Sequence, residues 1–450
     1  KKQDYFGVGL SLYLAPEKHN PFVSFYLFCQ FMERFTGLIG IALILGIAFA
    51  LSDNRKAINY RLVLSGLAIQ LGLAIFVLKT PPGQWLFNWL GSKVQRILKL
   101  ADEGGKFVFG PLVNQDAMGK ALGTGFVFAL QVMPAIIFVA VLVNIAYHVG
   151  LMQRVVSLFA RVMQWLMQVS GAEALSNVAS TFVGQVEAQI MIKPYLNTMT
   201  RSELLASMAG SFACIAGGVM AVYIAMGVPA PYLLAASIMA APAALVISKI
   251  VMPETEESVT KGKVQLEIKK THVNLLDAIS HGAGDGFKVA LNVIAMLIGF
   301  IALIAMIDLI LVKFGWTLHA LGMPVEGTQF SLNNLFGLLF AGFAWCMGVP
   351  SPEVMKVGSL LGTKLVINEF VAYANLAPMI KEGALSPKAV VIASFACCGF
   401  ANFSSIAIQV GGIGELAPDR RPDLAKLGFK ALVCGTLASY LSATIAGILS

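Results

Sequence analysis

Residues 289–311 read VALNVIAMLIGFIALIAMIDLIL, an apolar run in which Asp308 is the single charged side chain. At 1.5 Å per residue, a helix of this length crosses a hydrocarbon core of roughly 30 Å. Asp308 stands near the end of the run, where its side chain can reach the membrane interface. Similar apolar runs occupy residues 35–51, 62–78, 126–147, 204–226 and 232–251. The pattern predicts an all-α polytopic membrane protein with one integral membrane domain.

Composition and charge support this class. Of the 450 residues, 57% are hydrophobic and 12% are charged, whereas soluble domains are about half apolar and a quarter charged. The net charge of +8 comes from basic residues in short segments between apolar runs, which is typical of cytoplasmic loops. We therefore expect membrane lipid, and no nucleic acid, as a partner. The basic clusters are Arg55, Lys56 and Arg61; Lys261, Lys263, Lys269 and Lys270; and Arg420, Arg421, Lys426 and Lys430.

Two apolar segments are too interrupted to be simple spans. Residues 172–195 read AEALSNVASTFVGQVEAQIMIKPY and break at 184–187, and residues 332–355 read LNNLFGLLFAGFAWCMGVPSPEVM and break at 348–352. Short broken segments in two halves of a chain are typical of re-entrant hairpins around a midplane site in transporters with inverted repeats. Two ordinary kinked spans remain the alternative. Amphipathic interfacial helices are expected at 80–109 and 151–168.

Acidic residues inside apolar segments are candidates for function, because a carboxylate in hydrocarbon is costly unless it faces protein or water. Glu187 lies in the first broken segment, and Glu369 lies in the run GTKLVINEFVAYANLA at 362–377. Nearby polar groups are neutral: Gln185, Asn368 and the run CGFANFSS at 398–405. These side chains could be satisfied by hydrogen bonds between helices. Three such clusters with an aromatic ring favour recognition of a solute rich in hydroxyl and amide groups.

Other function classes lack their motifs. The spacing of Gly358, Gly362, Thr363 and Lys364 is wrong for a phosphate-binding loop, and neither G-x-S-x-G nor H-E-x-x-H occurs. The cysteines and histidines are scattered without metal-ligand spacing. We expect no enzyme activity and no cofactor. A channel or a non-transporting membrane scaffold remains an alternative.

Four motifs, in order, resemble one family. GQVEA at 184–188 is followed by KPY at 193–195 and TRSEL at 200–204, and IAGGV follows at 215–219. GTK at 362–364 precedes NEFVAY at 368–373, and CGFANFSS stands at 398–405. These motifs resemble those of the concentrative nucleoside transporters, bacterial type, and the resemblance extends from about residue 35 to the C-terminus.

The resemblance implies an ion-coupled secondary active transporter that imports nucleosides by alternating access. It also implies a homotrimer whose protomers have about eight transmembrane helices, two re-entrant hairpins and interfacial helices. A transporter of nucleobases, or of another hydroxylated amide-bearing solute, is the alternative. Carried over by position, Gln185 and Glu187 bind the base, Val219 flanks it, Phe400 lies against it, and Glu369, Asn402 and Ser405 bind ribose hydroxyls.

The same resemblance divides the chain into five parts. Residues 1–34 form a polar and amphipathic N-terminal segment, and residues 35–168 form scaffold spans with interfacial helices. Residues 169–251 form the first hairpin and its following spans, the first transport half. Residues 252–288 form a cytoplasmic loop with an amphipathic helix, and residues 289–450 form the second transport half with a C-terminal scaffold span. The absence of further spans before residue 35 resembles the bacterial type, so the inner membrane is the expected location.

The chain departs from the family pattern in two places. Near the base, Val186 stands where a Thr is usual, and Gln189 stands where a Pro is usual. At the ion site, sodium-coupled members have an Asn and a Ser at the positions of Ser180 and Cys214.

A hard cation prefers oxygen ligands, so a thiol is a poor substitute. Backbone groups near Val183 and Ile215 leave a weak Na⁺ site at most. The coupling ion is therefore Na⁺ or H⁺, and we favour weak or absent sodium dependence. Glu187 or Glu369 would carry the proton in a proton-coupled mechanism.

Overall fold

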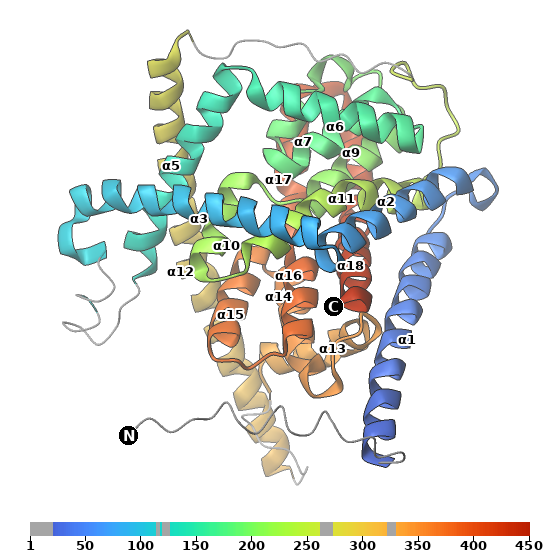
Figure 1. Ribbon diagram of the computed structural model, residues 1–450, viewed down its shortest axis with the longest axis vertical. Coiled ribbons are helices and arrows are strands. Elements are labelled where there is room, and N and C mark those ends of the chain that lie inside the picture. The colour runs from blue at the N-terminus through green and yellow to red at the C-terminus, as the bar shows by residue number, and fades with distance from the viewer. Residues whose placement is uncertain (1–20, 114–117, 119–126, 262–272, 322–329) are drawn as a thin grey trace.

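The computed structural model describes residues 21–113, 118, 127–261, 273–321 and 330–450, with residues 21–35 and 128 described by their backbone alone (Figure 1). Within these ranges the regular secondary structure is entirely helical. The predicted all-α class is therefore confirmed. The N-terminal segment expected at 1–34 lies outside the residues whose side chains are described.

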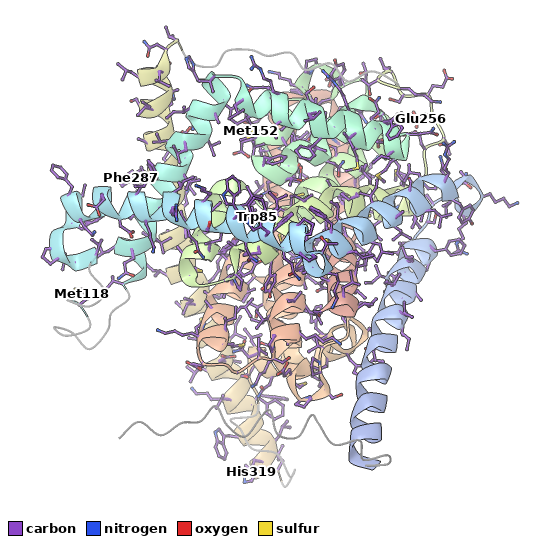
Figure 2. The ribbon with its side chains drawn as sticks, viewed as in Figure 1. Trp85, Met118, Met152, Glu256, Phe287 and His319 are labelled. Atoms are coloured by element: carbon purple, nitrogen blue, oxygen red, sulfur yellow. The ribbon has the colours of Figure 1, made fainter. Side chains whose placement is uncertain are left out.

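Three helices form the N-terminal part: α1 (Pro21–Ala50), α2 (Tyr60–Lys79) and α3 (Pro81–Phe109). Thr80 starts α3, because its hydroxyl accepts a hydrogen bond from the Gly83 N–H at 3.2 Å. In Figure 1, α3 runs across the bundle at a large angle to α1. Trp85 is 67% exposed on α3 and stacks on Trp89 with ring centroids 6.3 Å apart (Figure 2). This helix matches the amphipathic interfacial helix expected at 80–109.

The helices α5 (Phe128–His148) and α12 (Leu275–Ala320) pack along each other, and α6 (Leu151–Met167) follows α5. Small residues permit the close approach: a Cβ at Gly282 or Gly286 would lie 2.7 Å from a Cα of α5. The rest of α12 is apolar and mostly exposed, with Ile298 at 67%. Its exposed apolar surface suits lipid or a second protomer.

Two broken hairpins each precede a broken helix and a long helix. The first set is α7 (Gly171–Phe182), α8 (Glu187–Ile190), α9 (Arg201–Ala213), α10 (Gly217–Met226) and α11 (Ala230–Val251). The second set, after α13 (Leu332–Cys346), is α14 (Val354–Val366), α15 (Glu369–Lys381), α16 (Pro387–Cys397), α17 (Phe403–Leu416) and α18 (Arg421–Leu449). The same order of elements occurs twice, as expected for a transporter built from repeats.

Two breaks differ from the sequence expectation. The apolar run 204–226 is not one helix, because the backbone is extended at Cys214 between α9 and α10. The predicted break at 348–352 does separate α13 from α14, but Glu369 lies at another break, at 367–368 between α14 and α15. That break contains neither Gly nor Pro. Asn368 creates it by capping α15, with its side chain accepting from the Val371 N–H at 2.9 Å.

Six helices in the described ranges are long and apolar enough to cross a membrane. Shorter apolar helices include Thr36–Ala50 within α1 and Pro387–Cys397, which is α16. The centre of the bundle is formed by α9, α11, α16 and α18, whose residues are mostly buried. The broken helices therefore lie where their unpaired backbone is shielded from lipid, as such breaks must.

Candidate substrate site

Glu369 is the first residue of α15 and is 6% exposed. Its carboxylate accepts two hydrogen bonds, from the Tyr223 hydroxyl at 3.2 Å and from the Asn402 amide nitrogen at 3.0 Å. The N-terminus of α15 adds a favourable dipole for a negative charge. The acid that the sequence singled out therefore lies where the first and second sets of helices meet.

Tyr223 is a partner of Glu369 that the sequence did not single out. It is fully buried on α10, stacks on Tyr373 with centroids 4.2 Å apart, and meets the edge of Phe370 at 5.5 Å. Tyr373 in turn donates to the Ser394 carbonyl at 2.8 Å. The available signal was spacing, because Tyr223 follows Val219 by four residues and so shares its helix face. Val219 itself is half-buried on α10.

The break between α16 and α17 lies directly against the break between α9 and α10. The Phe400 N–H donates to the Cys214 carbonyl at 3.2 Å. Gly399 has φ +145°, and a Cβ there would lie 2.7 Å from the Phe212 carbonyl oxygen. Only glycine permits this backbone approach. The two breaks thus place Phe400, which is half-buried, beside the first helix set.

Asn402 is held in one orientation. Its side-chain oxygen accepts from the Ser405 N–H at 2.9 Å and from the Ser404 hydroxyl at 2.7 Å. Its amide nitrogen is thereby directed at Glu369. Ser405 lies in the first turn of α17 and is 2% exposed. The structure therefore joins the three residues expected to bind ribose into one buried polar group.

Gln185 and Glu187 lie at the tip of the first hairpin. Gly184 has φ +154°, and a Cβ on it would collide with the Glu187 carboxylate. Glu187 is exposed, and the buried side-chain oxygen of Gln185 has no hydrogen bond within the described part of the chain. Val186 packs against α17, since a Cβ at Gly412 would lie 2.8 Å from its side chain. The tip therefore presents polar groups beside the helix that carries Ser405.

The expected ion positions are already engaged by protein groups. Ser180 donates to the Ser176 carbonyl at 2.9 Å, and its oxygen lies 3.0 Å from the Ser211 hydroxyl. The Cys214 sulfur lies 3.5 Å from the Thr181 hydroxyl. Ser180 keeps one free lone pair, and a thiol is a poor ligand for a hard cation. The weak Na⁺ site expected at these positions stays a prediction.

Lys364 is a second residue whose role the sequence missed. Its side chain is fully buried, and within the described ranges its amine has no hydrogen bond. The amine lies 5.8 Å from the centroid of the Tyr440 ring and interacts electrostatically with Glu369. A buried cation near a buried carboxylate offsets part of the cost of burying either charge. Lys364 therefore adds a buried cationic group to the part of the interior that holds Glu369.

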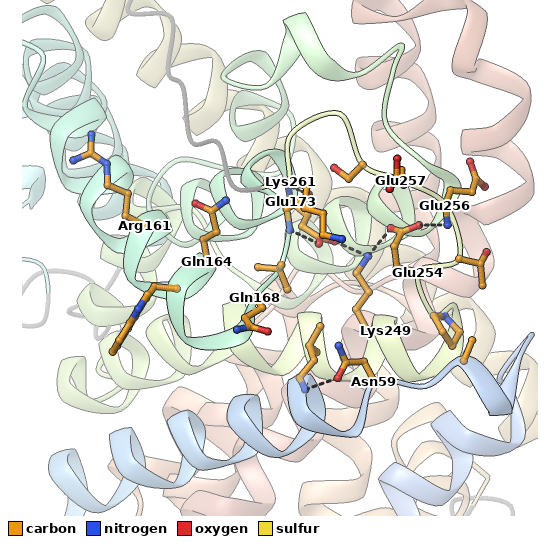
Figure 3. A pocket seen from close by; sticks show the side chains of 18 residues that line it. Asn59, Arg161, Gln164, Gln168, Glu173, Lys249, Glu254, Glu256, Glu257 and Lys261 are labelled. Carbon is orange, nitrogen blue, oxygen red and sulfur yellow. Dashed lines mark hydrogen bonds and ion pairs between the residues drawn. The ribbon is translucent and has the colours of Figure 1, made fainter.

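A cavity of about 810 Å³ lies away from these residues, between the start of α2, α6, and the segment after α11 (Figure 3). At its edge the Lys249 amine lies 2.7 Å from Glu173 and 3.2 Å from Glu254. None of the expected substrate residues lines it. Cavity volume is thus a poor guide here, and the convergence of buried polar side chains is the better one.

Three family models match the chain. Their descriptions are "Na+ dependent nucleoside transporter N-terminus" for residues 39–112, "Nucleoside recognition" for residues 129–230, and "Na+ dependent nucleoside transporter C-terminus" for residues 232–447. The matched regions include both broken hairpins and both broken helices.

Relatives and solved structures agree with the models. An uncharacterized transporter of Haemophilus influenzae is 42% identical, covering 93% of this chain and 98% of its own length. Nucleoside permease NupC of Helicobacter pylori is 38% identical, covering 91% and 96%. The rat sodium/nucleoside cotransporter 1 is 38% identical, covering 98% of this chain and 66% of its own length.

CNTnw in an inward-facing substrate-bound state superposes with a TM-score of 0.86 at 41% identity, covering 92% of this chain and 97% of that one. A variant of CNTnw in an outward-facing state gives a TM-score of 0.87 at 41% identity, covering 93% and 98%. The matched family models and relatives define the class as a membrane transporter and not an enzyme. This chain belongs to the Na⁺-dependent, or concentrative, nucleoside transporter family.

Proposed function

We propose that this protein imports nucleosides by ion-coupled alternating access. The observation that carries the proposal is the Glu369 carboxylate, which Tyr223 and Asn402 hold between the two broken helices. A carboxylate accepts two hydrogen bonds from neighbouring hydroxyls well, and the ribose of every nucleoside offers such a pair. Family membership supports the same substrate class.

Glu369, Asn402 and Ser405 bind the ribose in this proposal. Asn402 and Tyr223 then serve as the partners that keep the carboxylate satisfied before substrate enters, because an unpaired buried charge is costly. Phe400 provides an aromatic wall for the base, and Val219 flanks the opposite side. An apolar wall with a few oriented polar groups is the usual construction of a small-molecule site.

Gln185 and Glu187 read the base. The free oxygen of Gln185 accepts from a base N–H, and the exposed Glu187 carboxylate is accessible to a ligand. Val186 offers no hydroxyl, so this tip makes one polar contact fewer than a tip with Thr. Selectivity among bases depends on these two side chains, whereas ribose binding does not.

Two transport halves, 169–251 and the later part of 289–450, carry the site in this proposal, and 35–168 belongs to the scaffold. Residues 252–288 connect the halves on the cytoplasmic side. Rigid movement of the transport halves against the scaffold exposes the site to each side in turn. The apolar helices and the bacterial relatives place the protein in the bacterial inner membrane.

A homotrimer is part of the same proposal. The exposed apolar face of α12 supports it, because a contiguous apolar face must be covered by lipid or by protein. Membrane lipid covers the remaining exposed apolar surface, including Trp85 and Trp89 on α3.

The coupling ion follows from the family and from the local chemistry. The family is described as Na⁺-dependent. The hydroxyl of Ser180 and the thiol of Cys214 are weaker sodium ligands than two side-chain oxygens. We therefore expect sodium to act with low affinity in this protein, with a proton as the alternative coupling ion.

Uptake of labelled uridine, adenosine and uracil into proteoliposomes tests the proposal. Uridine or adenosine should accumulate against its gradient, and uracil should not compete strongly. Entry of uracil without ribosides would show that the solute is a nucleobase and would remove the ribose assignment. Equilibration without accumulation would indicate a channel, and no flux at all would indicate a scaffold.

A further inference from the structure

A polar network lies in the otherwise apolar interior between α7, α8 and α9. Its members are side chains with an exposed fraction of 1% or less, and they come from all three helices. Buried hydroxyl and amide groups destabilise a fold unless each finds a partner. The network consists of Ser176, Ser180, Gln189, Ser207 and Ser211.

Gln189 lies at the centre of this network. Its amide nitrogen donates to the Ser176 hydroxyl at 3.0 Å and to the Ser211 hydroxyl at 2.9 Å. Its side-chain oxygen accepts from the Ser207 hydroxyl at 2.7 Å. Both amide hydrogens and the amide oxygen are therefore used, and one side chain joins α8 to α7 and to α9.

The direction of each remaining hydrogen bond follows from counting donors. Ser207 gives its one hydrogen to Gln189, so Ser176 must donate across the 2.5 Å contact between the two serines. Ser180 gives its hydrogen to the Ser176 carbonyl, so Ser211 must donate to Ser180 at 3.0 Å. Every hydroxyl hydrogen has one acceptor. Such a fully satisfied network is rigid, because a change in any member leaves a buried group unpaired.

The network anchors α8, which is too short to be stable by itself. Helix α8 spans Glu187–Ile190, a single turn, and isolated helices of that length are unstable. Gln189 follows Glu187 by two residues and Gln185 by four. The side chain that ties α8 to α7 and α9 therefore lies next to the two residues that face the base.

We propose that Gln189 is a positioning residue that fixes the tip of the first hairpin and thereby sets recognition of the base. The proposal rests on the proposed function, because it concerns the same substrate site. Gln189 acts through Gln185 and Glu187 and has no contact with substrate of its own.

Gln189→Ala tests the proposal, with Gln70→Ala as the matched control. Gln70 is equally buried, lies on α2 outside the network, and has no hydrogen bond to its side chain within the described ranges. Gln189→Ala should raise KM for uridine about tenfold or more with kcat within about twofold, because the loss of ordered hydrogen bonds misplaces the tip. Gln70→Ala should leave both constants within about twofold. An unchanged KM in Gln189→Ala overturns the proposal.

A double-mutant cycle separates positioning from a general loss of stability. If Gln189 acts through the tip, Gln189→Ala should add little to the KM effect of Gln185→Ala. In combination with Ser405→Ala, by contrast, the fold-changes in KM of the two single variants should multiply. Independent, multiplicative effects with Gln185→Ala would reduce Gln189 to a stability role. A Gln185→Ala variant with unchanged KM would show that the tip does not read the base, which also overturns the proposal.

Ser207→Ala covers the case in which Gln189→Ala does not fold. It removes one donor to Gln189 and keeps the amide, so the expected rise in KM is smaller, about threefold, and follows the same pattern with Gln185→Ala. A wild-type KM in folded Ser207→Ala would contradict the proposed positioning role of Gln189. If wild-type protein transports no nucleoside, the proposed function fails; if wild-type transports and the network variants match it, only this inference fails.

Discussion

We expect Glu369 to be the residue on which substrate binding depends most. Glu369→Gln keeps the size of the side chain, removes its charge and replaces one of the two oxygens that accept from Tyr223 and Asn402 with an NH₂ donor. Loss of a hydrogen bond to a buried charged group costs about 1.5–3 kcal/mol, so uridine affinity should fall by about tenfold to more than a hundredfold. Isothermal titration of purified protein measures this. Wild-type affinity in the variant would remove the carboxylate from the site.

Glu187 should affect the base and not the sugar. Glu187→Gln should change the ranking of uridine, cytidine and adenosine by about tenfold, because bases differ in their donors and acceptors. The loss caused by removing the ribose 3′-hydroxyl should stay as it is in the wild type. Competition uptake with these nucleosides supplies both numbers. An equal loss for every nucleoside would argue against a base-facing role.

We expect Ser180 and Cys214 to determine how strongly sodium stimulates uptake. Uridine uptake under an inward Na⁺ gradient without a pH gradient should be weak and should not saturate at physiological sodium, because the site lacks two good oxygen ligands. Cys214→Ser replaces the thiol with a hydroxyl ligand and leaves Ser180 in its hydrogen bonds, so this variant should gain Na⁺ stimulation. Uptake under an inward pH gradient alone is the paired measurement. Strong saturable Na⁺ dependence in the wild type would contradict the expectation.

At the scale of elements, the paired helix breaks create the site. Gly399 has φ +145° and lies against the Phe212 carbonyl oxygen. Gly399→Ala would strain the backbone by about 1–3 kcal/mol and push the two breaks apart. We expect uptake to fall at least tenfold. Gly411→Ala on α17, where a Cβ meets nothing within 4 Å, is the control and should retain activity.

The helix elements were predictable to different degrees. The apolar runs and the break at 184–187, which begins with Gly184, have strong local signals, and both appear in the structure. The break at 367–368 has no Gly or Pro, and its cause is a side-chain cap by Asn368. The break at 214–216 interrupts a continuous apolar run. Hydropathy detects neither break, because the first depends on a side-chain cap and the second is stabilised by the Phe400 N–H from the other half of the chain.

At the scale of the whole molecule, a buried ion pair ties the first hairpin to the end of α11. Lys249 is 4% exposed and pairs with Glu173 at 2.7 Å and Glu254 at 3.2 Å. Lys249→Met leaves Glu173, itself 3% exposed, without its cation. Removing one partner of a buried pair costs about 3–5 kcal/mol. The thermal midpoint in detergent should fall by several degrees, with scintillation binding of uridine reduced in parallel.

Lys430→Met is the control for that prediction. Its pair with Asp53 is partly exposed, with side chains 32% and 46% accessible, and pairs of this kind contribute little. The midpoint should move by no more than a degree or two. A similar fall of the thermal midpoint in both variants would mean that burial does not determine how much these ion pairs contribute to stability.

The sequence alone determined that this is an all-α membrane transporter of one family and that Glu369, Asn402, Ser405, Gln185 and Glu187 are its candidate site residues. Long apolar runs, intramembrane acids and ordered motifs are local features, so they can be identified without knowing which residues are in contact. Only the tertiary structure decided that Tyr223 and Lys364 accompany Glu369, that two helix breaks face each other, and that Gln189 joins four serines. Each of these depends on helices far apart in sequence, whose packing distance and rotation no local pattern specifies.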